Sequence, residues 1–133
     1  DGIRDVERSR GLGDVYKRQE QPITLKSLER KIIPTGLFLA LPKGYEAQVR
    51  PRSGLAAKHG ITVLNAPGTI DADYRGDIGV ILVNLSQEPF TVVPQDRIAQ
   101  LVVAQYSTVK WKPISSLPES ERGSGGFGST GKK

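Results

Sequence analysis

Residues 51–56, PRSGLA, bring together a guanidinium group, a hydroxyl group and the backbone N–H groups of an expected helical turn. The Arg guanidinium can donate two parallel hydrogen bonds to phosphate oxygens, and the first backbone amides of a helix point outward. The segment is therefore a candidate anion-binding site. The alternative is a solvated Arg beside a Ser that caps the helix, and this segment alone does not separate the two.

The C-terminal tail, ERGSGGFGSTG, contains five Gly, two Ser, one Thr, one Arg and one Phe. Composition alone favours a flexible linker or a terminal scar. Phe127 argues against a linker, because a mobile arm that folds over a nucleotide would use an aromatic side chain to stack on the base. The backbone amides and hydroxyls of the tail, together with Arg122, would donate hydrogen bonds to phosphate oxygens. The spacing is not that of a P-loop, since no GKS or GKT sequence follows a strand here.

The segment NAPGTIDADYRGD begins at Asn65. Pro67 and Gly68 mark a tight turn between two extended runs, which predicts a β-hairpin with Asn65 near its mouth. Asp71 and Tyr74 lie on the second arm of this expected hairpin. A solvated hairpin built from ordinary turn residues is the alternative, because Asp and Asn are common in turns.

The segment RIAQLV indicates a core strand that carries two polar side chains, Arg97 and Gln100. Polar groups embedded in an apolar strand need hydrogen-bond partners. Neighbouring backbone groups at a sheet edge would supply them, and this segment alone favours that interpretation over a role in binding.

The elements that position these segments read as short strands separated by Gly, Pro and Asn, without a sustained helical period. This pattern predicts an all-β fold, and several strands are apolar on both faces, which indicates cover by a second sheet or by another subunit. We therefore expect a double sheet or jelly roll. The expected strands are 31–33, 36–41, 45–50, 61–64, 77–84, 90–93 and 98–106. One helical turn is expected at Ser53–His59, with Ser53 at its start and Gly60 at its end.

Composition narrows the classes of protein that fit. The chain has 133 residues, enough for one domain, and it has no Cys and a single His, which excludes a disulfide framework, a thiolate zinc site, a Cys nucleophile and a multi-histidine metal site. Residues 110–133 carry five basic and two acidic groups of a chain with net charge +5, which suits a small anion better than a nucleic acid. No apolar run approaches a membrane span and no signal peptide is evident, so we expect a soluble, cytoplasmic protein.

The sequence divides into three parts. Residues 1–21 are charged and poor in apolar side chains, unlike the rest of the chain, and we interpret them as an atypical, non-native leader or a sequence-assembly artefact. Residues 22–120 form the expected β-barrel domain. Residues 121–133 form the Gly-rich C-terminal arm.

Taken in order, PRSGLA, NAPGTIDADYRGD, RIAQLV and RGSGGFGSTG resemble motifs two to five of the trimeric dUTPase family, and the match spans about residues 23–131. The resemblance implies a jelly-roll-like, distorted β-barrel that assembles as a homotrimer, in which each active site draws hairpin, phosphate seat and arm from different subunits. It implies hydrolysis of dUTP to dUMP and pyrophosphate by attack of water on the α-phosphorus. Mg²⁺ would assist and would be held mainly by substrate phosphates and waters, so no protein ligand is assigned.

The resemblance also implies roles for individual residues. Asp71 matches the Asp that orients and deprotonates the water, and Tyr74 matches the residue that packs under the deoxyribose and leaves no room for a 2′-hydroxyl. The residues that match phosphate contacts are Arg52, Ser53, Gly54 and Gln100. Those that match the uracil pocket are Asn65, Gly68, Thr69 and Ile70. The residues of the closing arm are Arg122, Phe127, Gly128 and Ser129, with Phe127 stacked on uracil and Arg122 near the γ-phosphate.

The sequence departs from the family in two places. The first motif, roughly AGxDLxA, falls near residues 11–17, where this chain has GLGDVYK. Asp14 and Val15 imitate its Asp and Leu, but the flanking small residues differ. If the leader is an artefact, the true first strand is missing and stability, trimer packing or metal-linked activity would suffer. Asp77 stands where the family more often has Glu.

Three other functions compete with this interpretation. A dCTP deaminase of the same fold needs a carboxylate aimed at the cytosine ring, and residues 78–85 contain neither Glu nor Asp. A non-catalytic nucleotide binder would be favoured if Asp71 or the arm were absent, and both are present. A nucleic-acid-binding β-barrel is disfavoured by the dispersed charge and by an aromatic content of 6%.

Overall fold

The computed structural model describes residues 12–16 and 21–132 of the chain. Within these residues it contains nine strands and one helix. The elements are β1 (Leu12–Tyr16), β2 (Ile23–Leu25), β3 (Arg30–Pro34), β4 (Tyr45–Arg50), α1 (Ser53–His59), β5 (Ile61–Val63), β6 (Gly68–Ile70), β7 (Gly79–Asn84), β8 (Phe90–Val92) and β9 (Arg97–Gln105). The all-β fold expected from the sequence is confirmed.

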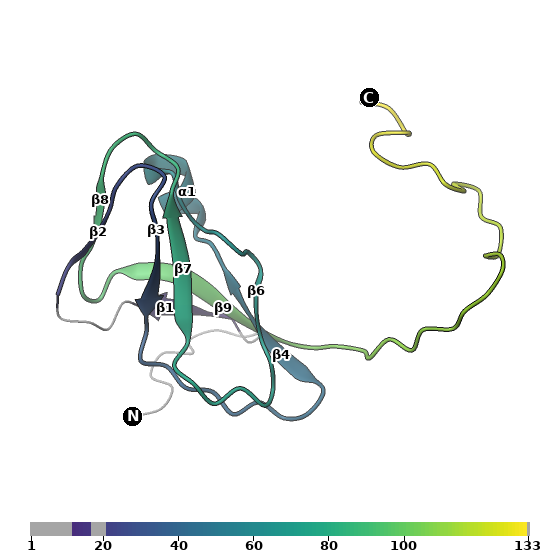
Figure 1. Cartoon of the computed structure of the whole chain (residues 1–133), viewed down its shortest axis with the longest axis horizontal. Helices are drawn as coiled ribbons and strands as arrows, with labels where there is room; N and C mark the ends of the chain where they lie inside the picture. Colours follow the sequence, from purple (N-terminus) through teal and green to yellow (C-terminus); the bar gives the residue numbers. More distant parts are fainter. Residues whose placement is uncertain (1–11, 17–20, 133) are drawn as a thin grey trace.

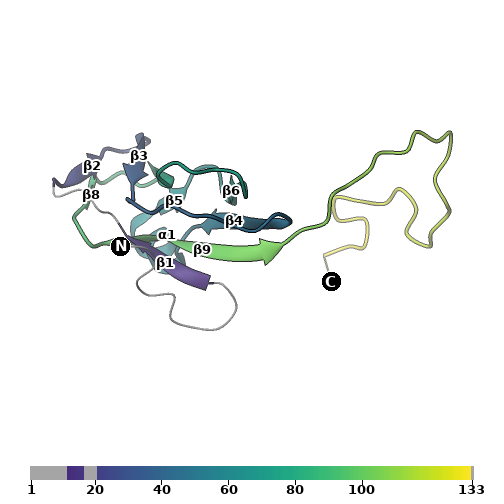
Figure 2. The same cartoon turned by 90° about the horizontal axis from the view of Figure 1, so that it is seen from below.

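The strands form three antiparallel sheets around one core (Figures 1 and 2). The sheets have the strand orders β1-β9-β4-β6, β3-β7-β5 and β2-β8. Each of the nine strands contributes at least one buried side chain to a single apolar cluster. The three sheets therefore enclose one hydrophobic interior, as expected for a jelly-roll-like barrel.

Alternation along the strands decides which side chains face this interior. In β4, Ala47 and Val49 are buried while the residues between and beside them are more exposed. In β7, Val80, Leu82 and Asn84 point to the same face and are all buried. Successive side chains of a strand point to opposite faces, so this period of two fixes the register of both strands against the core.

Helix α1 forms where the sequence predicts it, but its N-terminal cap differs. Gly60 closes the helix in the left-handed conformation, at φ 66° and ψ 24°, and its N–H donates to the carbonyl of Ala56. This is the C-cap geometry that favours Gly. The expected cap at Ser53 was wrong: the N-cap is Arg52, in extended conformation and without a side-chain capping bond, and Ser53 is the first helical residue.

Several predicted strand boundaries differ from those observed. Residues 36–41, which the structure describes, are not a strand; Leu37, Leu39 and Leu41 pack against the core from an irregular segment. Strand β2 was not predicted. The backbone groups of Thr35 and Leu37 bond to Ile78, but the segment that follows forms no regular strand ladder. The alternation of apolar residues in 36–41 therefore does not correspond to a strand.

The expected β-hairpin around Pro67 was also wrong in its pairing. The two extended runs exist, as β5 and β6, but β5 pairs with β7 whereas β6 pairs with β4. The turn between them therefore carries the chain from one sheet to another. Turn residues indicate a reversal of direction, but they do not identify the partner of each strand.

Strand β1 lies inside the segment interpreted as a leader. It pairs antiparallel with β9, where Asp14 is opposite Gln100, and Val15 is fully buried. Residues 1–11 and 17–20 lie outside the described residues, as do both ends of the GLGDVYK segment. The non-native origin of residues 1–21 and the limits of the three predicted parts stay predictions.

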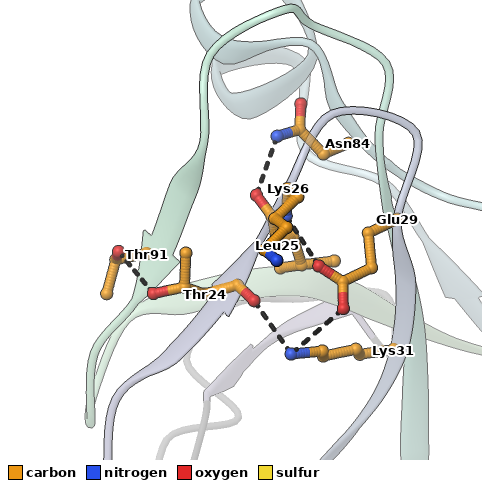
Figure 3. Close-up of polar contacts among 7 residues, drawn as sticks. All are labelled: Thr24, Leu25, Lys26, Glu29, Lys31, Asn84 and Thr91. Atoms are coloured by element: carbon orange, nitrogen blue, oxygen red, sulfur yellow. Dashed lines mark hydrogen bonds and ion pairs between the residues drawn. The ribbon is translucent and has the colours of Figure 1, made fainter.

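A buried amide joins the two-stranded sheet to β7 (Figure 3). The side-chain N–H groups of Asn84, which is 0% exposed, donate to the carbonyls of Leu25 at 3.0 Å and Glu88 at 2.7 Å. Its oxygen accepts from the backbone N–H of Ser86 at 2.9 Å. Every polar atom of this side chain thus has a partner inside the fold, which is the condition for burying an amide at low cost.

Substitution of Asn84 by Leu, which has a similar size, is expected to lower the free energy of unfolding by about 1–3 kcal/mol or more, because it strands buried carbonyl and N–H groups. Urea denaturation at neutral pH measures this change. The exposed Thr24, whose hydroxyl bonds to that of Thr91 at 2.9 Å, supplies a control: Thr24→Ala should change stability by less than about 0.5 kcal/mol. Equal losses in both variants would contradict the role given to Asn84.

The β2–β3 turn is closed by an acidic side chain, also drawn in Figure 3. The backbone N–H of Lys26 donates to Glu29 at 2.7 Å, and the Lys31 ammonium lies 3.2 Å from the same carboxylate. The hydrogen bond from Lys26, followed by that from Lys31, holds the pKa of Glu29 below its usual value. These contacts link the two ends of the exposed turn between β2 and β3.

Among residues 12–16 and 21–132, the structure contains no helix with the length and apolarity needed to cross a lipid bilayer. The cytoplasmic location expected from the sequence stays a prediction.

Candidate active site

Asp71 is placed at the surface by the short strand β6. Gly68 and Ile70 of this strand are buried, and Thr69 between them is exposed. The register Ala47 to Ile70 and Val49 to Gly68 ties β6 to β4. Asp71 follows directly and is exposed, so its carboxylate is anchored to the sheet through its own backbone but remains open to solvent.

Gly68 allows a close approach between β6 and the preceding turn. A Cβ at this position would lie 3.3 Å from the side-chain nitrogen of Asn65 and 3.4 Å from Cβ of Val49. The first separation is tighter than ordinary van der Waals contact, and the second is at its lower limit. The absence of a side chain at Gly68 therefore lets Asn65 lie beside β6, as a residue of the same turn.

A tight turn follows Asp71. The N–H of Tyr74 donates to the Asp71 carbonyl at 3.1 Å. The guanidinium of Arg75 donates to the carbonyls of Ala72 at 2.6 Å and Tyr74 at 3.0 Å. The Arg75 side chain thus braces the turn that links the carboxylate to the aromatic ring.

Four of the predicted site residues line one pocket of about 180 Å³, which we call the Asp71 pocket. Its lining residues are Thr69, Ile70, Asp71, Tyr74, Ile78 and Gly79. Pockets that enclose a whole drug-sized ligand usually measure about 300–1,000 Å³. The Asp71 pocket therefore holds only a part of a molecule as large as a nucleotide.

Asp71 also borders a second, larger pocket of about 610 Å³, the Lys43 pocket. Its lining residues are Leu41, Lys43, Asp71, Ala72, Asp73, Arg75 and Tyr106. Asp71 thus lies between a small pocket and a larger one whose lining includes two basic side chains, Lys43 and Arg75, and two acidic ones, Asp71 and Asp73. Lys43 was not predicted from the sequence, because nothing local distinguishes it from a solvated surface Lys. Arg75 was not predicted either, although it lies in the DYRG sequence beside Tyr74.

The residues predicted to contact phosphates line pockets other than the two that include Asp71, or lie at the surface of α1. Arg52 and Gly54 line a pocket of about 400 Å³ beside α1, which also contains Lys58, His59 and Arg97. Ser53 is exposed at the first position of the helix. Gln100, on β9, lines a fourth pocket, of about 450 Å³. Within one chain, then, neither of these pockets includes Asp71.

The predicted arm also lies apart from Asp71. After β9 the chain runs away from the sheets, as Figures 1 and 2 both show. The Phe127 side chain is fully exposed, and the Arg122 side chain donates to the carbonyl of Gly125 at 2.6 Å. Gly128 has φ +84°, and the N–H of Ser129 donates to Gly126 within a local turn. A single chain therefore presents an open site, with the predicted lid unattached to it.

Comparison with known proteins assigns this geometry to a family. The dUTPase family model matches residues 12–131, which is most of the chain.

The chain belongs to the dUTPase family.

Curated members of the family are similar over nearly the whole chain. The deoxyuridine 5′-triphosphate nucleotidohydrolase of Rickettsia felis is 59% identical over 126 residues, which cover 95% of this chain and 84% of that protein. The enzyme of the same name from Rickettsia conorii is 58% identical over the same share of each chain. The match to the family model includes residues 12–21, so the similarity to dUTPases begins within the segment interpreted as a leader.

Solved dUTPase structures have the same fold. A mutant of the Staphylococcus bacteriophage 80alpha dUTPase, described as bound to dUpNHpp, has a TM-score of 0.84 at 23% identity and covers 98% of this chain and 91% of its own. A mutant dUTPase from phage phi11 of S. aureus, whose description names a structural Mg(II) ion, has a TM-score of 0.75 at 19% identity and covers 87% of this chain and 90% of its own. The jelly-roll-like fold expected from the sequence is thereby confirmed.

Proposed function

We infer that this chain is a dUTP diphosphatase, which hydrolyses dUTP to dUMP and pyrophosphate and so keeps uracil out of DNA and supplies dUMP for dTTP synthesis. The observation that carries this inference is the placement of Asp71. The carboxylate is exposed at the end of β6, in one pocket with Tyr74, and it borders a second, larger pocket that is lined by both basic and acidic side chains. A solvent-accessible carboxylate beside a pocket for part of a nucleoside suits activation of a water for attack at the α-phosphate.

We propose that the site residues have different roles, which depend on where each lies in the fold. Asp71 orients and deprotonates the attacking water, and the Tyr74 ring supports the deoxyribose. The uracil edge is recognised by the β5–β6 turn and the backbone of β6, namely Asn65, Gly68, Thr69 and Ile70. The phosphates are contacted by Arg52, Ser53, Gly54 and Gln100. The arm closes over the bound nucleotide through Arg122, Phe127, Gly128 and Ser129.

We propose that Mg²⁺ takes part and is held mainly by phosphate oxygens and waters. Among the described residues, no group of three or more His, Cys, Asp or Glu could hold a metal ion. A cation that arrives with the triphosphate fits such a chain, because Mg²⁺ keeps several waters and binds readily to phosphates. When bound, it would neutralise charge on the phosphate oxygens during cleavage.

We propose that the working site forms between chains of a homotrimer. Within one chain, Arg52 and Gln100 line pockets that do not include Asp71, and the arm extends away from the sheets. Assembly that brings the α1 end of one chain and the arm of another to the Asp71 pocket would complete the set of contacts. This arrangement explains how residues so dispersed in the chain can serve one substrate.

Purified protein with Mg²⁺ is expected to release pyrophosphate from dUTP much faster than from dCTP, dTTP or UTP. For dCTP, a site that hydrogen-bonds the pairing edge of uracil rejects the mismatched base by up to about 10⁴-fold, because its own polar groups would be left unpaired. For UTP, the proposed position of Tyr74 under the sugar leaves no room for the 2′-hydroxyl. Initial rates of pyrophosphate release, measured with each nucleotide in turn, test this expectation. Equal rates with all four, or release of ammonia from dCTP, would refute the proposed function.

A further inference from the structure

We propose that Thr35 and Asp77 form a brace that positions Tyr74 and thereby sets the selectivity of the site for deoxyribose over ribose. The inference rests on the proposed function, in which the Tyr74 ring lies under the sugar. Neither Thr35 nor the carboxylate of Asp77 lines the Asp71 pocket. Both are therefore positioning residues, which act on the substrate only through Tyr74.

The Tyr74 ring is held at two points. Its hydroxyl donates to the backbone carbonyl of Asp77 at 2.9 Å. The ring also lies against the backbone of Gly76, where a Cβ would collide with the phenol oxygen and with the ring carbon that bears it. Because the side chain is 46% exposed, these two contacts rather than burial in the core fix the direction of the ring.

The carbonyl that holds Tyr74 is itself fixed from the segment after β3. The Asp77 carboxylate accepts from the backbone N–H of Gly36 at 2.7 Å and lies 3.5 Å from the Thr35 hydroxyl. A carboxylate that accepts a backbone N–H makes a stronger bond than a neutral acceptor. The position of residue 77 is therefore tied to a segment about forty residues earlier in the chain.

Thr35 completes this connection from the buried side. It is only 5% exposed, and its hydroxyl donates to the Ile78 carbonyl at 2.6 Å while accepting from the N–H of Leu37 at 3.1 Å. Backbone bonds from Thr35 to Ile78, at 3.2 Å, and from Ile78 to Leu37, at 2.9 Å, run alongside. The Thr35 hydroxyl thus joins two segments that no regular strand ladder joins at this point.

The consequence concerns the space beside the sugar. A ring that excludes a 2′-hydroxyl must be placed to within a fraction of an ångström, because one ångström of displacement can cost about 10²-fold in a positioned reaction. Loss of the Thr35 hydroxyl removes one of the two hydrogen bonds to the Ile78 carbonyl and the contact with the Asp77 carboxylate. It thereby loosens residues 77–78, to which the Tyr74 hydroxyl is bonded through the Asp77 carbonyl. Discrimination against ribose should weaken before the chemistry at Asp71 does.

The test compares kcat/KM for dUTP and UTP in matched variants. Thr35→Val keeps the shape of the side chain but lacks the hydroxyl, and it should lower the ratio of dUTP to UTP turnover by about tenfold, the effect of one lost hydrogen bond. Thr35→Ser keeps the hydroxyl and should keep the ratio. Tyr74→Phe removes the other end of the same connection at an exposed position, and it should reproduce the effect of Thr35→Val. Thermal melts report whether each variant is folded.

The outcomes separate the brace from the proposed function. If the wild-type protein does not prefer dUTP to UTP, the proposed function fails, and the brace fails with it. If the wild type prefers dUTP and a folded Thr35→Val or the Tyr74→Phe variant keeps the wild-type ratio, the brace alone is refuted. A similar loss in Thr35→Ser would also refute it, since packing rather than the hydroxyl would then be responsible.

Discussion

Substitution of Asp71 by Asn is expected to lower kcat for dUTP by about 10²–10⁴-fold, the usual contribution of a general base, while KM changes little. Asn retains the size of the side chain but accepts no proton at neutral pH. Because Asp71 is exposed and is held by its backbone, the fold should be unaffected. Pyrophosphate release under substrate saturation measures kcat, and binding of a non-hydrolysable dUTP analogue shows whether affinity is retained.

Asp73 supplies the matched control. It is an exposed carboxylate in the same turn and lines the Lys43 pocket, but it does not line the Asp71 pocket. If the two acids act only through their negative charge, Asp73→Asn will lower turnover as much as Asp71→Asn does. If Asp71 is the base, the control should stay within a few-fold of wild type, the range expected for exposed substitutions. Equal losses would contradict the catalytic role of Asp71.

The predictions that the structure bears out depend on local chemistry. Gly60 ends α1 as expected, because a left-handed C-cap is a property of one residue and its immediate neighbours. The period of two in residues 45–50 correctly indicates β4, since one face of that strand is buried. Such features need no knowledge of distant parts of the chain.

The predictions that failed depend on distant partners. The sequence around Pro67 indicates a reversal, yet β6 pairs with β4 rather than with β5. Residues 36–41 alternate like a strand, but their backbone bonds to Ile78 and its surroundings instead of a ladder. Strand β1 was missed because its stability comes from pairing with β9, more than eighty residues away. Pairing between segments remote in sequence leaves little local signal.

The same contrast between local and long-range information applies to the residues of the candidate site. Motif order identified Asp71 and Tyr74 together, and the structure places them in one pocket. The contribution of Arg75 to the turn and of Thr35 to Tyr74 could not be read from residue types, because each depends on which carbonyl lies within reach. Gln100 matches a phosphate contact in sequence but lines a separate pocket in one chain, and this separation supports the proposal, first implied by the family resemblance, of a site shared between chains.

Removal of residues 121–133 is expected to leave the barrel folded but to lower kcat/KM for dUTP by about 10²-fold or more, because a lid that positions substrate and excludes water contributes on that scale. The arm adds nothing to the buried core, since Phe127 is fully exposed and residues 121–124 and 127–132 are all exposed. The thermal melting temperature should therefore be close to that of the full chain. Steady-state kinetics and circular dichroism on the same preparation measure both quantities.

Substitutions at Phe127 distinguish stacking from mere closure. Phe127→Ala should weaken dUTP binding by about 10–100-fold, since stacking of one base on an aromatic ring contributes about 1–3 kcal/mol. Phe127→Tyr keeps the ring and should behave like wild type. Wild-type turnover in the truncated chain, or equal losses in the Ala and Tyr variants, would contradict the role of the arm.

A mixture of two inactive chains tests whether the arm serves its own chain or another. The Asp71→Asn chain has an arm but no base, and the truncated chain has a base but no arm. Co-expressed in one assembly, they can form a complete site only if an arm reaches an Asp71 that belongs to a different chain. Recovered dUTP turnover would establish sharing. Isolated mixed assemblies without activity would show that each arm closes on its own chain.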